Sequence, residues 1–207
     1  MNAYQNRASL MVSTIVSVSI LIAGCSSDEP VVQQDSQVTH VAIESLSDSQ
    51  QLQKEKAIAG KDKLFQTLLG ELTKSMQASG PAESISVCKT RAPEIAKAVG
   101  EELGITIGRT SLKLRNPGNT SPEWAESFVD SQTETPVSVA LEEGKLGVLL
   151  PIKLKTNCLL CHGSIEDLNE GVVAALAKNY PDDQATGFAE GDLRGYFWVE
   201  VPGKSSE

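Results

Sequence analysis

The chain has 207 residues, a formal net charge of −9 and 40% hydrophobic residues. This length suits one folded domain with its own core once a short N-terminal segment is set aside. An acidic chain is a poor ligand for nucleic acid, because phosphate binding needs clustered Lys and Arg, so no nucleic-acid partner is expected.

The first residues have the pattern of an export signal. Arg7 precedes a mostly apolar run from Ala8 to Ala23 that is too short to span a membrane comfortably. Small residues directly before Cys25 resemble the lipobox of bacterial lipoproteins, in which the cysteine is diacylated and becomes the new N-terminus. We therefore expect a lipoprotein signal peptide over residues 1–24 and a lipid on Cys25, with an ordinary secretory signal as the alternative.

A lipid on Cys25 would anchor the protein on the periplasmic side of a bacterial membrane. Ser26 follows it where an inner-membrane retention aspartate might stand, which favours the outer membrane. Residues 25–49 are rich in Ser, Asp, Gln and Val without a helical stripe, so they predict a flexible tether. His40 lies in this tether and is expected to be solvated, and the folded domain is expected over residues 50–207.

Helical periodicity follows the tether. Gln50–Ser79 predicts a helix that ends at Gly80–Pro81, a second helical piece carries Cys88, and a further piece begins at Pro93 and ends before Gly104. The apolar stripe of the first helix consists of Leu64, Phe65, Leu68, Leu69, Leu72 and Met76.

The pattern then changes to strands. Alternating and β-branched residues predict them over Ile105–Arg115, Val137–Leu141, Leu146–Leu154 and Leu193–Val201. The second and third should form a hairpin. Short helices are expected with Pro122 near the first position and over Asn169–Lys178. Helices followed by mainly antiparallel strands with helical insertions indicate an α+β domain.

Cys158-Leu159-Leu160-Cys161-His162 has the C-x-x-C-H pattern of c-type haem attachment. The thiols of Cys158 and Cys161 would add across the haem vinyl groups, and His162 would supply an axial nitrogen to the iron. A zinc site would need two more ligands, and a dithiol redox pair does not require the histidine. We therefore expect one covalently bound haem c.

The residues alone leave the second axial ligand open. No methionine follows His162, and the motif lies late in the chain after several strands, unlike the motifs of common electron carriers. Met76, Cys88, a lysine, water or no ligand remain as choices. Met76 belongs to the apolar stripe and fits a core better. Cys88 is the cysteine left over after lipid and haem, in a compartment that oxidises free thiols.

Six segments occur in order along the chain: Ile85–Lys89, Ala92–Ala96, Arg109–Pro117, Asn119, Cys158–Gly163 and Gly191–Gly195. Together they resemble a known family of exported or membrane-attached, single-haem proteins, first catalogued as a domain of unknown function and also found as the sensor part of some histidine kinases. The resemblance covers Leu52 to Pro202 and implies a PAS-like antiparallel sheet. It also implies a haem ligated by the motif histidine and a cysteine, a role that only Cys88 can fill.

Ligation by histidine and thiolate would stabilise ferric iron and lower its reduction potential relative to His–Met ligation. Release of Cys88 on reduction would open a site for CO or NO. We therefore expect a redox or diatomic-gas sensor that acts on a separate protein partner, with a low-potential electron-transfer cytochrome as the alternative. Enzymatic activity is not expected, because no spare distal histidine is visible.

Charged and aromatic residues complete the expected site. Arg109 and Arg115 are candidates for pairing with haem propionates, because a guanidinium binds a carboxylate through two parallel hydrogen bonds. Trp124, Phe188 and Trp198 would either line the haem or fill the core.

Overall fold

The computed structural model describes residues 39–40 and 45–203, which belong to one compact unit, Ser36–Glu207. The predicted signal peptide, Cys25 and most of the predicted tether lie outside the described residues. Within the described part of the chain, no helix combines the length and apolarity needed to cross a bilayer.

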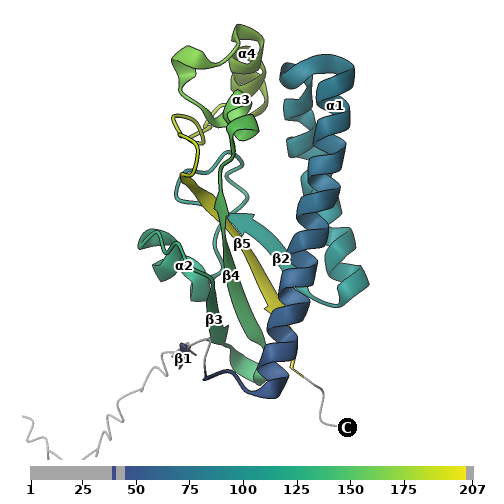
Figure 1. Ribbon diagram of the computed structural model, residues 1–207, viewed down its shortest axis with the longest axis vertical. Helices are drawn as coiled ribbons and strands as arrows, with labels where there is room; N and C mark the ends of the chain where they lie inside the picture. The colour runs from purple at the N-terminus through teal and green to yellow at the C-terminus, as the bar shows by residue number, and fades with distance from the viewer. Residues whose placement is uncertain (1–38, 41–44, 204–207) are drawn as a thin grey trace, which may run out of the picture. The chain divides into compact units, whose positions relative to one another are not determined.

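The helices and strands follow the predicted order, and the α+β fold with a PAS-like antiparallel sheet, N-terminal helices and helical insertions is confirmed (Figure 1). The elements are β1 (Thr39–His40), α1 (Asp48–Leu103), β2 (Thr106–Thr110), α2 (Glu123–Asp130), β3 (Val137–Ala140), β4 (Leu146–Lys153), α3 (Leu159–His162), α4 (Glu170–Asn179) and β5 (Leu193–Val201), with 3-10 turns η2 (Glu142–Gly144), η3 (Thr156–Cys158) and η4 (Ile165–Asp167).

α1 is a pair of helices joined at Gly80, whose φ of 81° and ψ of 174° interrupt the helix. The predicted break at Gly80–Pro81 is therefore confirmed. The prediction that a separate piece begins at Pro93 is wrong, because the second helix continues through it. The missing N–H of Pro93 removes one helical hydrogen bond, while the buried side chains on either side of it, Ala92 and Ile95, hold the helix against the core.

The two halves of α1 lie against each other (Figure 1). Arg91 in the second half donates to both carboxylate oxygens of Glu71 in the first half, at 2.8 Å each. Lys63 and Glu102 form a further ion pair across the same pair of helices. These contacts lie at the surface, where ion pairs contribute little energy, so the buried apolar side chains provide most of the stability.

The sheet is antiparallel with the strand order β1-β3-β4-β5-β2. β1 lies inside the segment expected to be a tether, and it pairs with β3. β2 ends at Thr110, so the strand predicted up to Arg115 is too long. Residues 111–115 leave the sheet because other partners hold them: the Ser111 hydroxyl donates to the carbonyl of Arg194 at 2.7 Å, and Leu114 O accepts from Gln184 N at 2.9 Å.

Side chains alternate between the two faces of the sheet, and each face has its own helix. α1 packs against the face that carries Val148 and Phe197, whereas α2 packs against the face that carries Leu149 and Tyr196. Trp124 and Trp198 belong to the α2 face. Both tryptophans therefore fill that core, and the site described below lies on the α1 face.

Replacing Leu64 by alanine should destabilise the fold. Leu64 is fully buried in the core between α1 and the sheet, so Leu64→Ala should lower the free energy of unfolding by about 2–5 kcal/mol through lost burial and a cavity. Leu52→Ala on the same helix is the control, because Leu52 is 56% exposed. Urea unfolding followed by circular dichroism measures both, and equal losses would contradict the described packing.

Candidate functional site

A cavity of about 220 Å³ lies on the α1 face of the sheet, at the end where β4 leads into the C-x-x-C-H motif. Both halves of α1, the start of β5 and the loop after β2 contribute side chains to it. All the residues predicted to bind the haem and its iron line this cavity. These residues are Cys88, Arg109, Arg115, Cys158, Cys161 and His162. The two that lie furthest apart in the chain, Cys88 and His162, are separated by 74 positions.

The motif forms one compact helical turn. η3 ends at Cys158, α3 runs from Leu159 to His162, and Gly163 donates its N–H to Leu159 O at 2.9 Å. A Cβ on Gly163 would lie 2.7 Å from that same carbonyl, which is too close. Glycine at this position therefore lets the chain turn sharply after the histidine.

His162 is held in one orientation by the segment that precedes β5. Its Nδ1 lies 2.7 Å from Ala185 O and donates to it, since a carbonyl can only accept. This bond leaves Nε2 as the nitrogen with the free lone pair. Burial, together with the nearby arginines, lowers the pKa of His162 to about 3, so the ring is neutral. The Phe188 ring packs edge-on to the imidazole, with centroids 6.4 Å apart.

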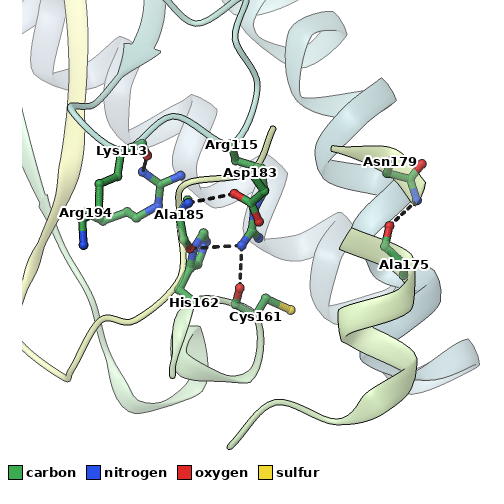
Figure 2. A network of polar contacts seen from close by, with 9 residues as sticks. All are labelled: Lys113, Arg115, Cys161, His162, Ala175, Asn179, Asp183, Ala185 and Arg194. Carbon is green, nitrogen blue, oxygen red and sulfur yellow. Dashed lines mark hydrogen bonds and ion pairs between the residues drawn. The ribbon is translucent and has the colours of Figure 1, made fainter. Parts of the chain in front are cut away.

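Arg115 connects the motif to this same segment (Figure 2). Its side chain is only 7% exposed, and its Nε donates to Asp183 Oδ2 at 3.0 Å. Its Nη2 donates to Cys161 O at 2.6 Å and to Ala185 O at 3.1 Å. These contacts give Arg115 a structural role that the sequence did not indicate. Its pairing with a propionate stays a prediction.

Arg109 and Arg194 differ from Arg115, because neither forms an ion pair within the described residues. Arg194 Nη1 donates to Lys113 O at 3.0 Å, while its Nε is buried without a hydrogen-bond partner. Burial lowers the pKa of both guanidinium groups, that of Arg194 to about 10. Two half-buried positive charges that line one cavity favour negative partners.

Sequence reasoning missed Arg194 and Asp183. The same chemical argument that selected Arg109 would have selected Arg194, because it is an arginine in an acidic chain inside the Gly191–Gly195 segment. Asp183 gave no such signal. It lies 68 positions from Arg115 in the chain and reaches it only through the fold.

Cys88 lies in the second half of α1 and is half-buried at the cavity. Burial raises the pKa of its thiol, while Arg109, Arg115 and Arg194 oppose this rise. The thiols of Cys88, Cys158 and Cys161 are all free. Met76, the other protein side chain considered by name as second ligand, lines the same cavity.

The lining has the chemical groups that a covalently bound haem needs. It combines two thiols, a neutral histidine with a free Nε2, a third thiol and two guanidinium groups without ion-pair partners. Apolar side chains complete it, and Phe65 and Leu69 remain 40% and 47% exposed along its edge. The Nε of Arg194 is buried without a hydrogen-bond partner, so it is the atom that best indicates an anionic ligand here.

Comparison with known proteins agrees with this fold. The sequence profile of the Tll0287-like family matches residues 26–202. The crystal structure of the cyanobacterial haem protein Tll0287 superposes with a TM-score of 0.54 at 23% identity, over 77% of this chain and 100% of that one. No curated protein matches the chain. The family resemblance seen in the sequence motifs is thus confirmed, and the chain belongs to the Tll0287-like family.

Proposed function

We propose that this protein binds one haem c, attached through Cys158 and Cys161, with His162 and Cys88 as the two axial ligands of its iron. The observation that carries the proposal is the convergence of these four side chains on one cavity. The similar crystal structure is described as that of a haem protein, and this description supports the choice of ligand.

A bound haem supplies a redox-active iron. Ala185 orients His162 so that Nε2 is free to bind. The second half of α1, which is distant from the motif in sequence, places Cys88 at the cavity. Phe65, Leu68 and Phe197 line the cavity with apolar side chains that would contact the haem.

Arg109 and Arg194 are the residues that we assign to the two haem propionates. Both line the cavity and both lack a carboxylate partner within the described residues, so two carboxylates would balance two half-buried charges. Arg115 is less suited to this task, because its Nε and Nη2 already bind the protein.

The physiological role that we propose is a redox or diatomic-gas sensor. Cys88 would hold ferric iron as a thiolate. As a protonated thiol, after an external donor has supplied an electron, it would hold the iron less strongly and leave a position for a diatomic ligand. Its helix begins directly after the break at Gly80. A lipid on Cys25 would hold the sensor on the periplasmic side of the outer membrane, where a separate protein would receive the signal.

An electron-transfer cytochrome is the second candidate. Leu160, inside the motif, is 48% exposed, and Ile165, three residues after its histidine, is 51% exposed. Apolar side chains at the surface beside a haem suit brief docking of a redox partner. Fast electron self-exchange without a ligand change would favour this role, whereas slow exchange with a ligand change on reduction would favour the sensor.

Covalent attachment can be tested on denaturing gels. Wild-type protein purified after export should show peroxidase-active haem stain at its own mass, and Cys158→Ala/Cys161→Ala should show none, because both thioether bonds are removed. Cys88→Ala is the control and should keep the stain, since an axial ligand is not needed for the covalent link. An unstained wild type would disprove the proposal.

The axial role of Cys88 can be tested by spectroscopy. Cys88→Ala should change the ferric absorption and electron paramagnetic resonance spectra, because a thiolate ligand is lost. Met76→Ala is the matched control, since Met76 lines the same cavity. Unchanged spectra of Cys88→Ala would disprove the assignment of Cys88 as an iron ligand. If only Met76→Ala changed the spectra, Met76 would be the second ligand instead.

Arg194 can be tested by resonance Raman spectroscopy of the purified holoprotein. Arg194→Gln should shift the bending mode of one haem propionate, because a charged hydrogen-bond donor is lost. Arg91→Gln removes the same charge from the surface, where Arg91 is 46% exposed, and should leave the mode in place. Equal spectra for all three proteins would show that Arg194 does not contact a propionate.

A further inference from the structure

The carbonyl of Ala185 accepts two hydrogen bonds of different kinds (Figure 2). One comes from Nδ1 of His162 at 2.7 Å and the other from Nη2 of Arg115 at 3.1 Å. A carbonyl oxygen has two lone pairs, so these donors use its full capacity and compete for its electron density. Ala185 is fully buried, and water is therefore excluded as a replacement partner.

This competition bears on the donor strength of His162. A metal-binding histidine becomes a stronger donor when its second ring nitrogen gives its proton to a good acceptor. A guanidinium bound to the same acceptor weakens that effect, because it draws electron density from the oxygen. Its positive charge also lies close to the ring, because both groups bind the same carbonyl oxygen.

Asp183 opposes the charge of Arg115 from within the same network. Its Oδ2 accepts from Arg115 Nε at 3.0 Å, and its Oδ1 accepts from the backbone N–H of Ala185 at 2.8 Å. Arg115, Asp183 and Ala185 thus form a closed ring of hydrogen bonds. The two charged side chains are 7% and 8% exposed, so solvent screens them little.

We infer that Arg115 is a positioning residue that weakens His162 as an iron donor through the shared Ala185 carbonyl, and that Asp183 limits this effect. The inference rests on the proposed haem ligation by His162. Arg115 would thereby raise the reduction potential that the histidine and thiolate ligands lower. The haem-attachment motif itself does not encode this adjustment, because both residues lie far from it in the chain. Arg115 lies 46 positions before Cys161, and Asp183 lies 21 positions after His162.

The test uses two variants that each remove one charge and have opposite expected effects. Arg115→Gln removes the positive charge, so the midpoint potential of the purified holoprotein should shift downward. Asp183→Asn removes the opposing negative charge, so the potential should shift upward. The double variant should lie between the two. Arg91→Gln is the control for net charge, because its side chain is 46% exposed and its charge is screened by solvent, and it should leave the potential near the wild-type value.

A purely structural role gives a different result. Loosening the segment around Ala185 would admit water in both variants and shift both potentials in the same direction, and that outcome would overturn the inference. The iron–histidine stretching frequency of the ferrous protein gives a second reading, which should rise in Arg115→Gln as His162 becomes a stronger donor and should fall in Asp183→Asn. If Arg115→Gln does not fold, Asp183→Asn alone decides, since an unchanged or lowered potential contradicts the inference.

Failure of this inference is distinguishable from failure of the proposed function. Wild-type protein without a covalent haem signal would remove the haem proposal itself. Wild-type protein with a normal haem spectrum, in which both variants shift together or not at all, would leave haem binding intact and remove only the role assigned to Arg115 and Asp183.

Discussion

The buried ion pair between Arg115 and Asp183 is the interaction on which the site depends. Each partner also binds backbone: Arg115 binds the carbonyls of Cys161 and Ala185, and Asp183 binds the N–H of Ala185. These contacts hold together three segments that are distant in sequence, namely the loop after β2, the C-x-x-C-H turn and the loop before β5. Removing one charge would leave the other buried and unpaired, which is the costly way to break such a pair.

This arrangement separates two tasks that a sequence motif cannot separate. Cys158, Cys161 and His162 come from one helical turn, so local geometry alone places them. The orientation of the imidazole and the charge around it come from elsewhere, through Ala185 and the arginines. The same turn could therefore serve proteins of different reduction potential, with the surrounding loops supplying the difference.

The break at Gly80 positions the part of the cavity wall that contains Cys88. Without it, α1 would continue as a single long helix and Cys88 would lie far from the motif. The turn brings the second helix back along the first, and Arg91 and Glu71 bridge the two. The positive φ of 81° explains why glycine occupies this position, since a side chain there would be strained.

The sequence by itself determined what depends on neighbouring residues. It predicted β5 with its observed bounds, the β3–β4 hairpin and the end of the first helix at Gly80, because each follows from periodicity or turn residues. Tertiary structure decided the end of β2, the continuity through Pro93 and the side of the sheet on which Trp124 lies. It also decided the different surroundings of Arg109, Arg115 and Arg194, because the partner of a buried charge can come from any part of the chain, and only the folded arrangement selects it.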